Sequence, residues 1–417
     1  MSATATTFSV RFLGCKVSQA DAALIRDALR DAGHVEATPE TAEVHVVNTC
    51  ALTVEAERKS RREANRGARR GRVFVSGCAV NLNARQFAGP GVTTVPGSAD
   101  RAANEIVHLL GGARPTACAD DAPRAPGRTR AFLKVQNGCD SACAFCIIPT
   151  TRGRAESRPL ARILAEGRRR IAEGHPELVL TGINIGTFRD PGSGADLADL
   201  VRAAGRLDGL RRLRISSIEP GNVGDRLLAA MAETPVVAPH MHVPLQSGDP
   251  GVLRAMRRSY GVDAYLDACR RARAALPGLN LTTDAIVGFP CEDEAAFVAT
   301  ARVVEDLAMS KVHVFPYSPR PGTPAAAMDG RPPADVLRER ARRLRDLSDR
   351  LGLAHRSRRV GGRDRVLVER RHPDGTLGGL SADYTRFVLP AGAGEPGEMV
   401  AVAIEGLAGG HLVGRPL

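Results

Sequence analysis

Three cysteines lie close together near the middle of the chain, in the run Cys139-Asp-Ser-Ala-Cys143-Ala-Phe145-Cys146. Cysteine thiolates are soft ligands that favour iron–sulfur clusters. Three thiolates leave one iron of a four-iron cluster without a protein ligand, and an open coordination position is typical of a reactive metal centre rather than a structural one. The spacing therefore predicts a 4Fe–4S cluster held by Cys139, Cys143 and Cys146.

A zinc site and three unconnected thiols are the alternatives for these cysteines. Zinc would require a fourth Cys or His, and none lies within the twenty residues after Cys146. The N-terminus has neither a basic segment nor an apolar segment for export, and no apolar run approaches the length of a membrane span. We therefore expect a cytoplasmic protein, in which the nine cysteines are metal ligands or free thiols rather than disulfides.

Three more cysteines each follow a strand predicted in the first part of the chain. Strands are predicted at residues 7–13, 44–47 and 73–75, with helices at 19–32 and 53–70. This alternation indicates a parallel sheet flanked by helices, and such sheets bind ligands beyond the carboxyl ends of their strands. Cys15, Cys50 and Cys78 stand at three such ends. They are expected to meet as the ligands of a second 4Fe–4S cluster, although buried core thiols are the alternative.

The central part of the chain alternates six predicted strands with helices. The strands are predicted at 131–136, 177–180, 213–217, 240–244, 281–287 and 311–315, and the helices at 160–173, 197–204, 225–231, 263–276 and 292–307. This order predicts a partial (β/α)6 barrel, whose active site lies at the carboxyl ends of the strands. Polar residues follow the strands there, at Asn137, Asn184, Glu219, Gln246, Asp284 and Tyr317.

An Arg-rich amphipathic helix is predicted at 333–358, and the hydrophobic period changes to two after it. Short alternating strands separated by turn residues predict a small closed β-barrel. The expected fold class is α/β. We expect a parallel sheet domain at 6–115, a linker at 116–130, the partial barrel at 131–357 and the β-barrel at 358–417.

The chain is basic, with a net charge of +12. Its basic side chains are concentrated at 58–72, 152–170 and 331–359. This distribution favours a polyanionic partner, nucleic acid first. Solvated helix faces are the alternative explanation for such runs.

These motifs together resemble the methylthiotransferases of the radical S-adenosylmethionine (SAM) class, over nearly the whole chain. The runs that carry the resemblance are Leu13-Gly-Cys15-Lys-Val-Ser-Gln19, Asn48-Thr-Cys50-Ala-Leu-Thr53, Val75-Ser-Gly-Cys78-Ala79, Gly138-Cys-Asp-Ser-Ala-Cys-Ala-Phe-Cys-Ile-Ile-Pro149 with Arg152-Gly153, and Phe315-Pro-Tyr-Ser-Pro-Arg-Pro-Gly-Thr323. The terminal barrel is similar to the TRAM domain, a small RNA-binding module. Ser18 stands where the family usually has Asn and keeps a hydrogen-bonding side chain, and Cys291 stands where Gly is usual. Cys118, Cys269 and Cys291 receive no role.

The resemblance implies an enzyme that uses SAM and two 4Fe–4S clusters. The set Cys139, Cys143 and Cys146 would hold the cluster that cleaves SAM, and the set Cys15, Cys50 and Cys78 would hold an auxiliary cluster that supplies sulfur. A radical derived from SAM would remove hydrogen from an unactivated carbon, which then accepts a methylthio group. SAM would contact the residues Phe145, Gly182, Asn184 and Gln246. Core packing is the alternative for Phe145, and an ordinary strand-to-helix turn is the alternative for 181–184.

Branches of this family differ in substrate. The runs Thr181-Gly-Ile-Asn-Ile-Gly186 and Lys311-Val-His-Val-Phe-Pro-Tyr317 are most similar to the MtaB branch, which methylthiolates carbon 2 of N6-threonylcarbamoyladenosine beside the tRNA anticodon. The resemblance thus implies tRNA and a flavodoxin- or ferredoxin-like electron donor as partners, with no membrane contact and a sulfur source that the sequence leaves unidentified. The alternatives are isopentenyl-adenosine in tRNA, an aspartate of a ribosomal protein, and a non-catalytic iron–sulfur protein that binds RNA.

Overall fold

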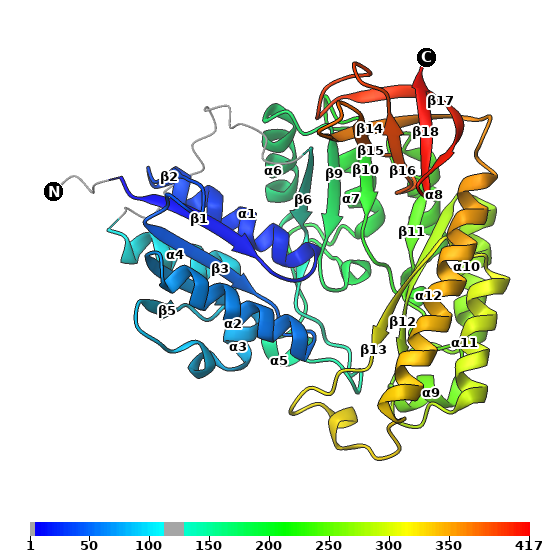
Figure 1. The fold of residues 1–417 in the computed structure, drawn as a ribbon, viewed down its shortest axis with the longest axis horizontal. Helices are drawn as coiled ribbons and strands as arrows, with labels where there is room; N and C mark the ends of the chain where they lie inside the picture. Colours follow the sequence, from blue (N-terminus) through cyan, green and yellow to red (C-terminus); the bar gives the residue numbers. More distant parts are fainter. Residues whose placement is uncertain (1–4, 112–128) are drawn as a thin grey trace.

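The structure is a computed structural model that describes residues 5–111 and 129–417. Figure 1 shows three parts in chain order: a sheet with its helices in blue and cyan, a curved half barrel in green and yellow, and a small β-barrel in orange and red. The α/β class and this order of parts were predicted from the sequence. The expected linker at 116–130 lies outside the described residues except for its last two, and Cys118 lies outside them as well.

The N-terminal sheet has five parallel strands in the order β2-β1-β3-β4-β5. Its elements are β1 (Thr7–Phe12), α1 (Lys16–Asp31), β2 (Val35–Glu36), β3 (Val44–Thr49), α2 (Val54–Ala68), β4 (Arg72–Gly77), α3 (Cys78–Leu82), the 3-10 helix η1 (Ala84–Phe87), β5 (Val92–Thr94) and α4 (Ala99–Leu109). All of β3 is buried because its side chains alternate between two helical layers. Val46 shares an apolar cluster with Ile106 of α4, whereas Val47 shares one with Ala64 of α2.

The half barrel has six parallel strands in two groups, β10-β9-β6 and β11-β12-β13. These strands are β6 (Arg130–Lys134), β9 (Glu177–Thr181), β10 (Arg212–Ile215), β11 (His240–His242), β12 (Asn280–Val287) and β13 (Lys311–Pro316), and a small hairpin is formed by β7 (Gln136–Asn137) and β8 (Glu156–Ser157). A bridge between Leu213 and Val237 joins the two groups. The prediction of six strands is therefore confirmed, and β6 and β13 are the two edges of the half barrel.

Helices alternate with these strands and cover the outside of the half barrel. They are α5 (Ile148–Arg152), α6 (Leu160–Ala172), α7 (Leu197–Gly205), α8 (Asp225–Glu233), α9 (Pro250–Ala255), α10 (Val262–Ala275) and α11 (Glu294–Asp306), with 3-10 helices η2 (Ile185–Thr187), η3 (Pro220–Asn222) and η4 (Pro324–Ala327). Helix α1 of the first part lies along the edge strand β6, where Lys134 Nζ pairs with Asp21 Oδ1 at 2.6 Å. The first part therefore borders the open side of the half barrel.

The long helix α12 (Ala334–Ser357) leads into the terminal β-barrel. The barrel strands are β14 (Arg363–Arg371), β15 (Leu377–Leu380), β16 (Arg386–Leu389), β17 (Met399–Ala408) and β18 (His411–Pro416), closed in the order β14-β15-β16-β18-β17. Closure confirms the predicted small barrel. Strand β15 was not predicted because the central residues of Leu377-Gly-Gly-Leu380 have no side chains to show alternation.

The terminal barrel lies against the amino ends of the half-barrel strands (Figure 1). Buried Glu177 pairs with Arg214 at 2.6 Å and with Arg212 at 3.0 Å. These two arginines donate to backbone carbonyls of the barrel, Arg214 to Ser381 at 2.6 Å and Arg212 to Arg365 at 2.7 Å. The carboxyl ends of the strands, with the cysteine-rich loops, are therefore left free at the opposite end.

Candidate active site

The loop from β6 to α5 carries the first cysteine set. Gly138 opens it with φ +66°, and a Cβ there would lie 1.8 Å from the carbonyl oxygen of Arg154, so only glycine fits. The loop then turns back on itself, with the Cys146 N–H donating to the Cys143 carbonyl at 3.1 Å. Burial, together with the nearby charges of Cys143 and Cys139, raises the pKa of Cys146 to about 11. The three thiols therefore lie close enough to act on one another.

The second cysteine set lies at the carboxyl ends of the adjacent strands β1, β3 and β4. Cys15 caps the start of α1, Cys50 follows β3, and Cys78 is the first residue of α3. A Cβ on Gly14 would lie 2.9 Å from Cys50 Sγ, so this glycine lets the first loop approach the second. Burial raises the pKa of Cys50 to about 12, with added repulsion from Cys78 and Cys15. The fold thus brings together three residues that are far apart in sequence.

An arginine donates to one sulfur of each set. Arg152 Nε lies 3.1 Å from Cys78 Sγ, and Arg258 Nη1 lies 3.0 Å from Cys143 Sγ. Thiol burial without a ligand disfavours the thiolate, whereas a guanidinium aimed at the sulfur favours it. Two sets of three sulfurs, each with a cationic donor, therefore fit metal clusters, whose sulfur ligands carry negative charge.

Arg152 also connects the two sets. It belongs to α5, which follows the first cysteine loop, yet its guanidinium donates to Asp21 of α1 at 2.9 Å and to Asn137 after β6 at 2.9 Å. Burial opposes ionisation of Asp21, but Lys134 and Arg152 outweigh it and lower the pKa of this carboxyl. Our sequence analysis singled out Arg152 only as part of a motif and overlooked Arg258, Asp21 and Lys134.

The residues predicted to contact SAM lie around the mouth of the half barrel. The side-chain carbonyl of Gln136, overlooked in the sequence analysis, accepts the backbone N–H groups of Ile183 and Asn184 at 3.1 and 2.9 Å. A Cβ on Gly182 would lie 2.8 Å from the Gln136 carbonyl, so this strand end is held tightly against the first cysteine loop. Gln246 has φ +65° and bridges to β12 through its backbone.

Phe145 lies in a small apolar cluster rather than alone at the mouth. Its ring meets Phe289 edge to face at 6.5 Å, and Phe289 meets Tyr317 in the same way at 5.3 Å. Ala144 and Ile286 belong to the same cluster. Core packing thus accounts for much of the position of Phe145, and its contact with SAM stays a prediction, as do those of Gly182, Asn184 and Gln246.

Polar side chains line the interior of the half barrel next to this mouth. His242 of β11, Asp284 of β12 and His313 of β13 have side-chain atoms within 4.8 Å of one another, and His242 Nε2 lies 3.1 Å from Asp284 Oδ1. Burial lowers the pKa of His313, so its imidazole is neutral near pH 7. Along the same face of β12, Ile286 reaches the cluster around Phe145. The polar group therefore lies directly beneath the first cysteine loop.

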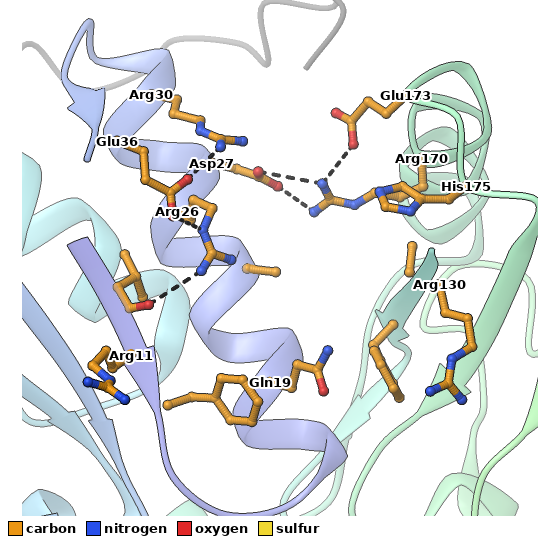
Figure 2. Close-up of a pocket in the computed structure, with 15 residues that line it drawn as sticks. Arg11, Gln19, Arg26, Asp27, Arg30, Glu36, Arg130, Arg170, Glu173 and His175 are labelled. Atoms are coloured by element: carbon orange, nitrogen blue, oxygen red, sulfur yellow. Dashed lines mark hydrogen bonds and ion pairs between the residues drawn. The ribbon is translucent and has the colours of Figure 1, made fainter. Parts of the chain in front are cut away.

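A separate cavity of about 520 Å³ lies between α1 and α6, and Figure 2 shows its charged lining. Arg26 pairs with Glu36 at 2.7 Å, and Arg170 lies between Asp27 and Glu173. Each arginine of the lining is therefore paired with a carboxylate. This cavity joins the first part to the half barrel and does not offer a free positive site.

The two remaining cysteines in the described residues lie apart from both sets. Cys269 is buried in α10, and burial raises the pKa of its thiol to about 12. Cys291 is exposed with φ +71°, a conformation that favours glycine. Ser18 Oγ lies 3.8 Å from Cys15 Sγ, so the departure from Asn leaves a polar atom beside the second set.

Comparisons with known families agree with this geometry. Residues 133–304 match the radical SAM superfamily, and residues 7–93 match the uncharacterized protein family UPF0004. In fold, the chain is similar to the radical SAM methyltransferase TsrM from Kitasatospora setae, with a TM-score of 0.57 at 15% identity over 77% of this chain and 75% of that one.

No helix in 5–111 or 129–417 is both long and apolar enough to cross a bilayer.

Two similar relatives carry different substrate names. The chain is 34% identical to the tRNA-2-methylthio-N(6)-dimethylallyladenosine synthase 1 of Mycobacterium marinum, over 99% of this chain and 86% of the relative. It is 36% identical to the threonylcarbamoyladenosine tRNA methylthiotransferase MtaB of Bacillus subtilis, over 84% of this chain and 82% of the relative. A non-catalytic RNA-binding protein is thereby excluded. The chain belongs to the radical SAM tRNA methylthiotransferases, enzymes that use SAM and 4Fe–4S clusters.

Proposed function

We propose that this enzyme methylthiolates carbon 2 of N6-threonylcarbamoyladenosine beside the anticodon of tRNA. The observation that carries the proposal is the polar interior of the half barrel. His242, Asp284 and His313 come from three neighbouring strands and converge beneath the first cysteine loop. The base must enter this space for its carbon 2 to reach the reacting groups.

The two candidate bases differ in the substituent on N6. A dimethylallyl group is a hydrocarbon, whereas a threonylcarbamoyl group carries a urea, a hydroxyl and a carboxylate. Covering buried polar side chains with hydrocarbon costs about 1–3 kcal/mol for each group left without a hydrogen bond. The polar interior therefore favours the threonylcarbamoyl substituent.

We assign the two cysteine sets to the two clusters. Cys139, Cys143 and Cys146 would hold the cluster that binds SAM, and Cys15, Cys50 and Cys78 would hold the auxiliary cluster. When bound, these groups supply the radical and the sulfur. Arg258 and Arg152 hold one sulfur of each set in place and stabilise its negative charge.

The tRNA would bind over the basic faces of the molecule. Arg62 on helix α2 and Arg69 directly after it are exposed, and the described residues provide no acidic partner for either. Unpaired arginines favour phosphate. We expect the enzyme to work in the cytoplasm with a flavodoxin- or ferredoxin-like reductant.

The proposal is tested by offering two anticodon stem-loop RNAs to the reconstituted enzyme. One RNA carries N6-threonylcarbamoyladenosine and the other N6-dimethylallyladenosine, with the same flanking sequence. Mass spectrometry of the nucleosides should find the methylthio product from the first RNA and little from the second. Product from the dimethylallyl RNA alone would overturn the proposal.

A further inference from the structure

Lys16 is a cation without an anionic partner next to the second cysteine set. It begins α1 directly after Cys15, is half-buried, and forms no ion pair within 5–111 or 129–417. The other three lysines of the chain are all paired: Lys59 with Glu55, Lys134 with Asp21, and Lys311 with Asp349. The ammonium of Lys16 lies over the ring of Tyr384, 5.5 Å from its centroid.

Lys16 lines a cavity of about 580 Å³ where the three parts of the molecule meet. The half barrel contributes His240, His242 and His313, α12 contributes Arg356, and the terminal barrel contributes Tyr384. The cavity thus continues the polar interior from the level of Asp284 toward the terminal barrel. It is rich in hydrogen-bond donors and positive charge.

Tyr384 is held at the floor of this cavity in a strained conformation. Its φ of +66° is unusual for a large side chain. The ring lies 3.7 Å from the guanidinium carbon of Arg214 and meets His240 edge to face at 4.7 Å. Terminal-barrel residues are therefore built into the interior of the half barrel.

Two buried polar atoms at this floor have no hydrogen-bond partner. They are the hydroxyl of Tyr384 and Nδ1 of His240, a residue that is only 5% exposed. The tyrosine hydroxyl is a hydrogen-bond donor, and buried donors are nearly always satisfied in a folded protein, so this unpartnered hydroxyl points to a ligand. Together with the unpaired ammonium of Lys16, this hydroxyl forms a pair of donors suited to an anion with more than one acceptor oxygen.

We infer that Lys16 and Tyr384 bind the carboxylate of the threonylcarbamoyl group. This inference rests on the proposed function. The exocyclic bonds at carbon 2 and carbon 6 of an adenine diverge, so a base with carbon 2 toward the cysteine sets directs its N6 substituent deeper into the half barrel. The terminal barrel then contributes to recognition of the modified base itself. An RNA phosphate has the same chemistry and is the other source of an anion.

The assignment is tested by changing the carboxylate of the substrate and the residues of the proposed site in the same experiment. The RNA substrate carries either threonylcarbamoyladenosine or its carboxamide analogue, and each is offered to the reconstituted wild type, Lys16→Met and Tyr384→Phe. The wild type should prefer the carboxylate in kcat/KM by about 10- to 100-fold, as expected for a charged hydrogen bond. Lys16→Met should reduce this preference to near one, and Tyr384→Phe should reduce it in part. Lys311→Met, which removes a paired lysine at the rim of the same cavity, should keep the preference.

The ratio is insensitive to a general loss of activity, so a change at the neighbouring Cys15 does not imitate the result. An undiminished preference in Lys16→Met, with threonylcarbamoyl RNA still methylthiolated, would overturn the inference and leave the proposed function intact. If the wild type shows no preference and Lys16→Met lowers kcat/KM equally for both RNAs, the site binds a phosphate of the RNA. That result would also overturn the inference. Activity on dimethylallyl RNA alone would overturn both.

Discussion

Arg152 is the residue through which the two cysteine sets are coupled. It is carried by the helix that follows the first set, and it donates to Cys78 of the second. Hydrogen bonds to the sulfur ligands and positive charge nearby are among the factors that set the reduction potential of an iron–sulfur cluster. We therefore expect Arg152, carried by the helix after the first set, to tune the reduction potential of a cluster held by the second set.

Replacing this arginine should affect the auxiliary site selectively. Arg152→Met keeps the length of the side chain but removes its charge and donors, so the reduction potential of the auxiliary cluster should fall. Methylthiolation should drop at least about tenfold, while release of 5′-deoxyadenosine from SAM continues. A redox titration followed by electron paramagnetic resonance measures the potential. Arg154→Met is the matched control, because that side chain is 93% exposed; the same potential in wild type and Arg152→Met would contradict the coupling.

The cysteines were predictable from sequence because their types and their positions after strands carry the signal. The side chains that form hydrogen bonds and ion pairs around these cysteines could not be predicted. Arg258 and Cys143 are 115 positions apart, and Lys134 and Asp21 are 113 apart, so no local pattern joins the members of either pair. The lack of an acidic partner for Lys16 was equally unpredictable, because it depends on residues from distant parts of the chain that surround Lys16 in the fold.

At the scale of elements, the loop between β6 and α5 depends on a backbone that only glycine permits at position 138. The carbonyl of Arg154 closes over this position from the far end of the loop. A side chain here would have to displace backbone, which moves the first thiol away from the other two. The path of the first cysteine loop is therefore set by the backbone contacts at Gly138.

Gly138→Ala should lose the first cluster while the protein remains folded. We expect iron content to fall to about half of the wild-type value after reconstitution, as one of two four-iron clusters is lost, with no 5′-deoxyadenosine formed. Gly153→Ala is the control that introduces backbone strain without a steric clash. Gly153 has φ +73°, but the space where a Cβ would stand is open. That variant should keep its iron and lose only about 1–2 kcal/mol of stability. Full iron content in Gly138→Ala would show that the loop adapts.

Long, strongly patterned elements were predicted well and short ones were not. Buried β3 and the long helix α12 agree with their expected positions to within a few residues. The edge strands β2 and β5 and the helices α3 and α5 have two to five residues each, too few to establish a period. These short helices nevertheless carry Cys78 and Arg152, which were singled out by their motifs and not by the period of the helices that hold them.

At the scale of the whole molecule, the terminal barrel is joined to the half barrel through a buried charge network. Glu177 holds Arg212 and Arg214, and both arginines donate to barrel carbonyls. A second connection links Arg359 of the chain segment after α12 to Asp383 at 2.8 Å. Since Tyr384 lies between these contacts, their rigidity also positions the floor of the cavity.

Removing Glu177 should loosen this connection. Glu177→Ala leaves two buried guanidinium groups without their carboxylate, which should lower the free energy of unfolding by about 3–5 kcal/mol. Chemical denaturation measures the loss, and limited proteolysis should release the terminal barrel earlier. Glu405→Ala removes an exposed partner of Arg415 within the barrel and should cost no more than about 1 kcal/mol. Equal stability of the two variants would contradict a structural role for the buried network.

The order and class of the three parts followed from hydrophobic periodicity, but their docking did not. Periodicity reports which face of an element is buried, not which part of the chain buries it. The contacts of Lys16, Arg130 and Arg214 with Tyr384 join three parts of the molecule, and none of them could be inferred before the parts were assembled.

The iron and sulfide content of anaerobically reconstituted protein tests most directly whether two cysteine sets hold two clusters. Wild-type protein should contain about eight irons per chain, and Cys50→Ala and Cys143→Ala should each contain about four. Cys50→Ala should still cleave SAM without inserting sulfur, whereas Cys143→Ala should do neither. About four irons in the wild type, unchanged by Cys50→Ala, would contradict the account.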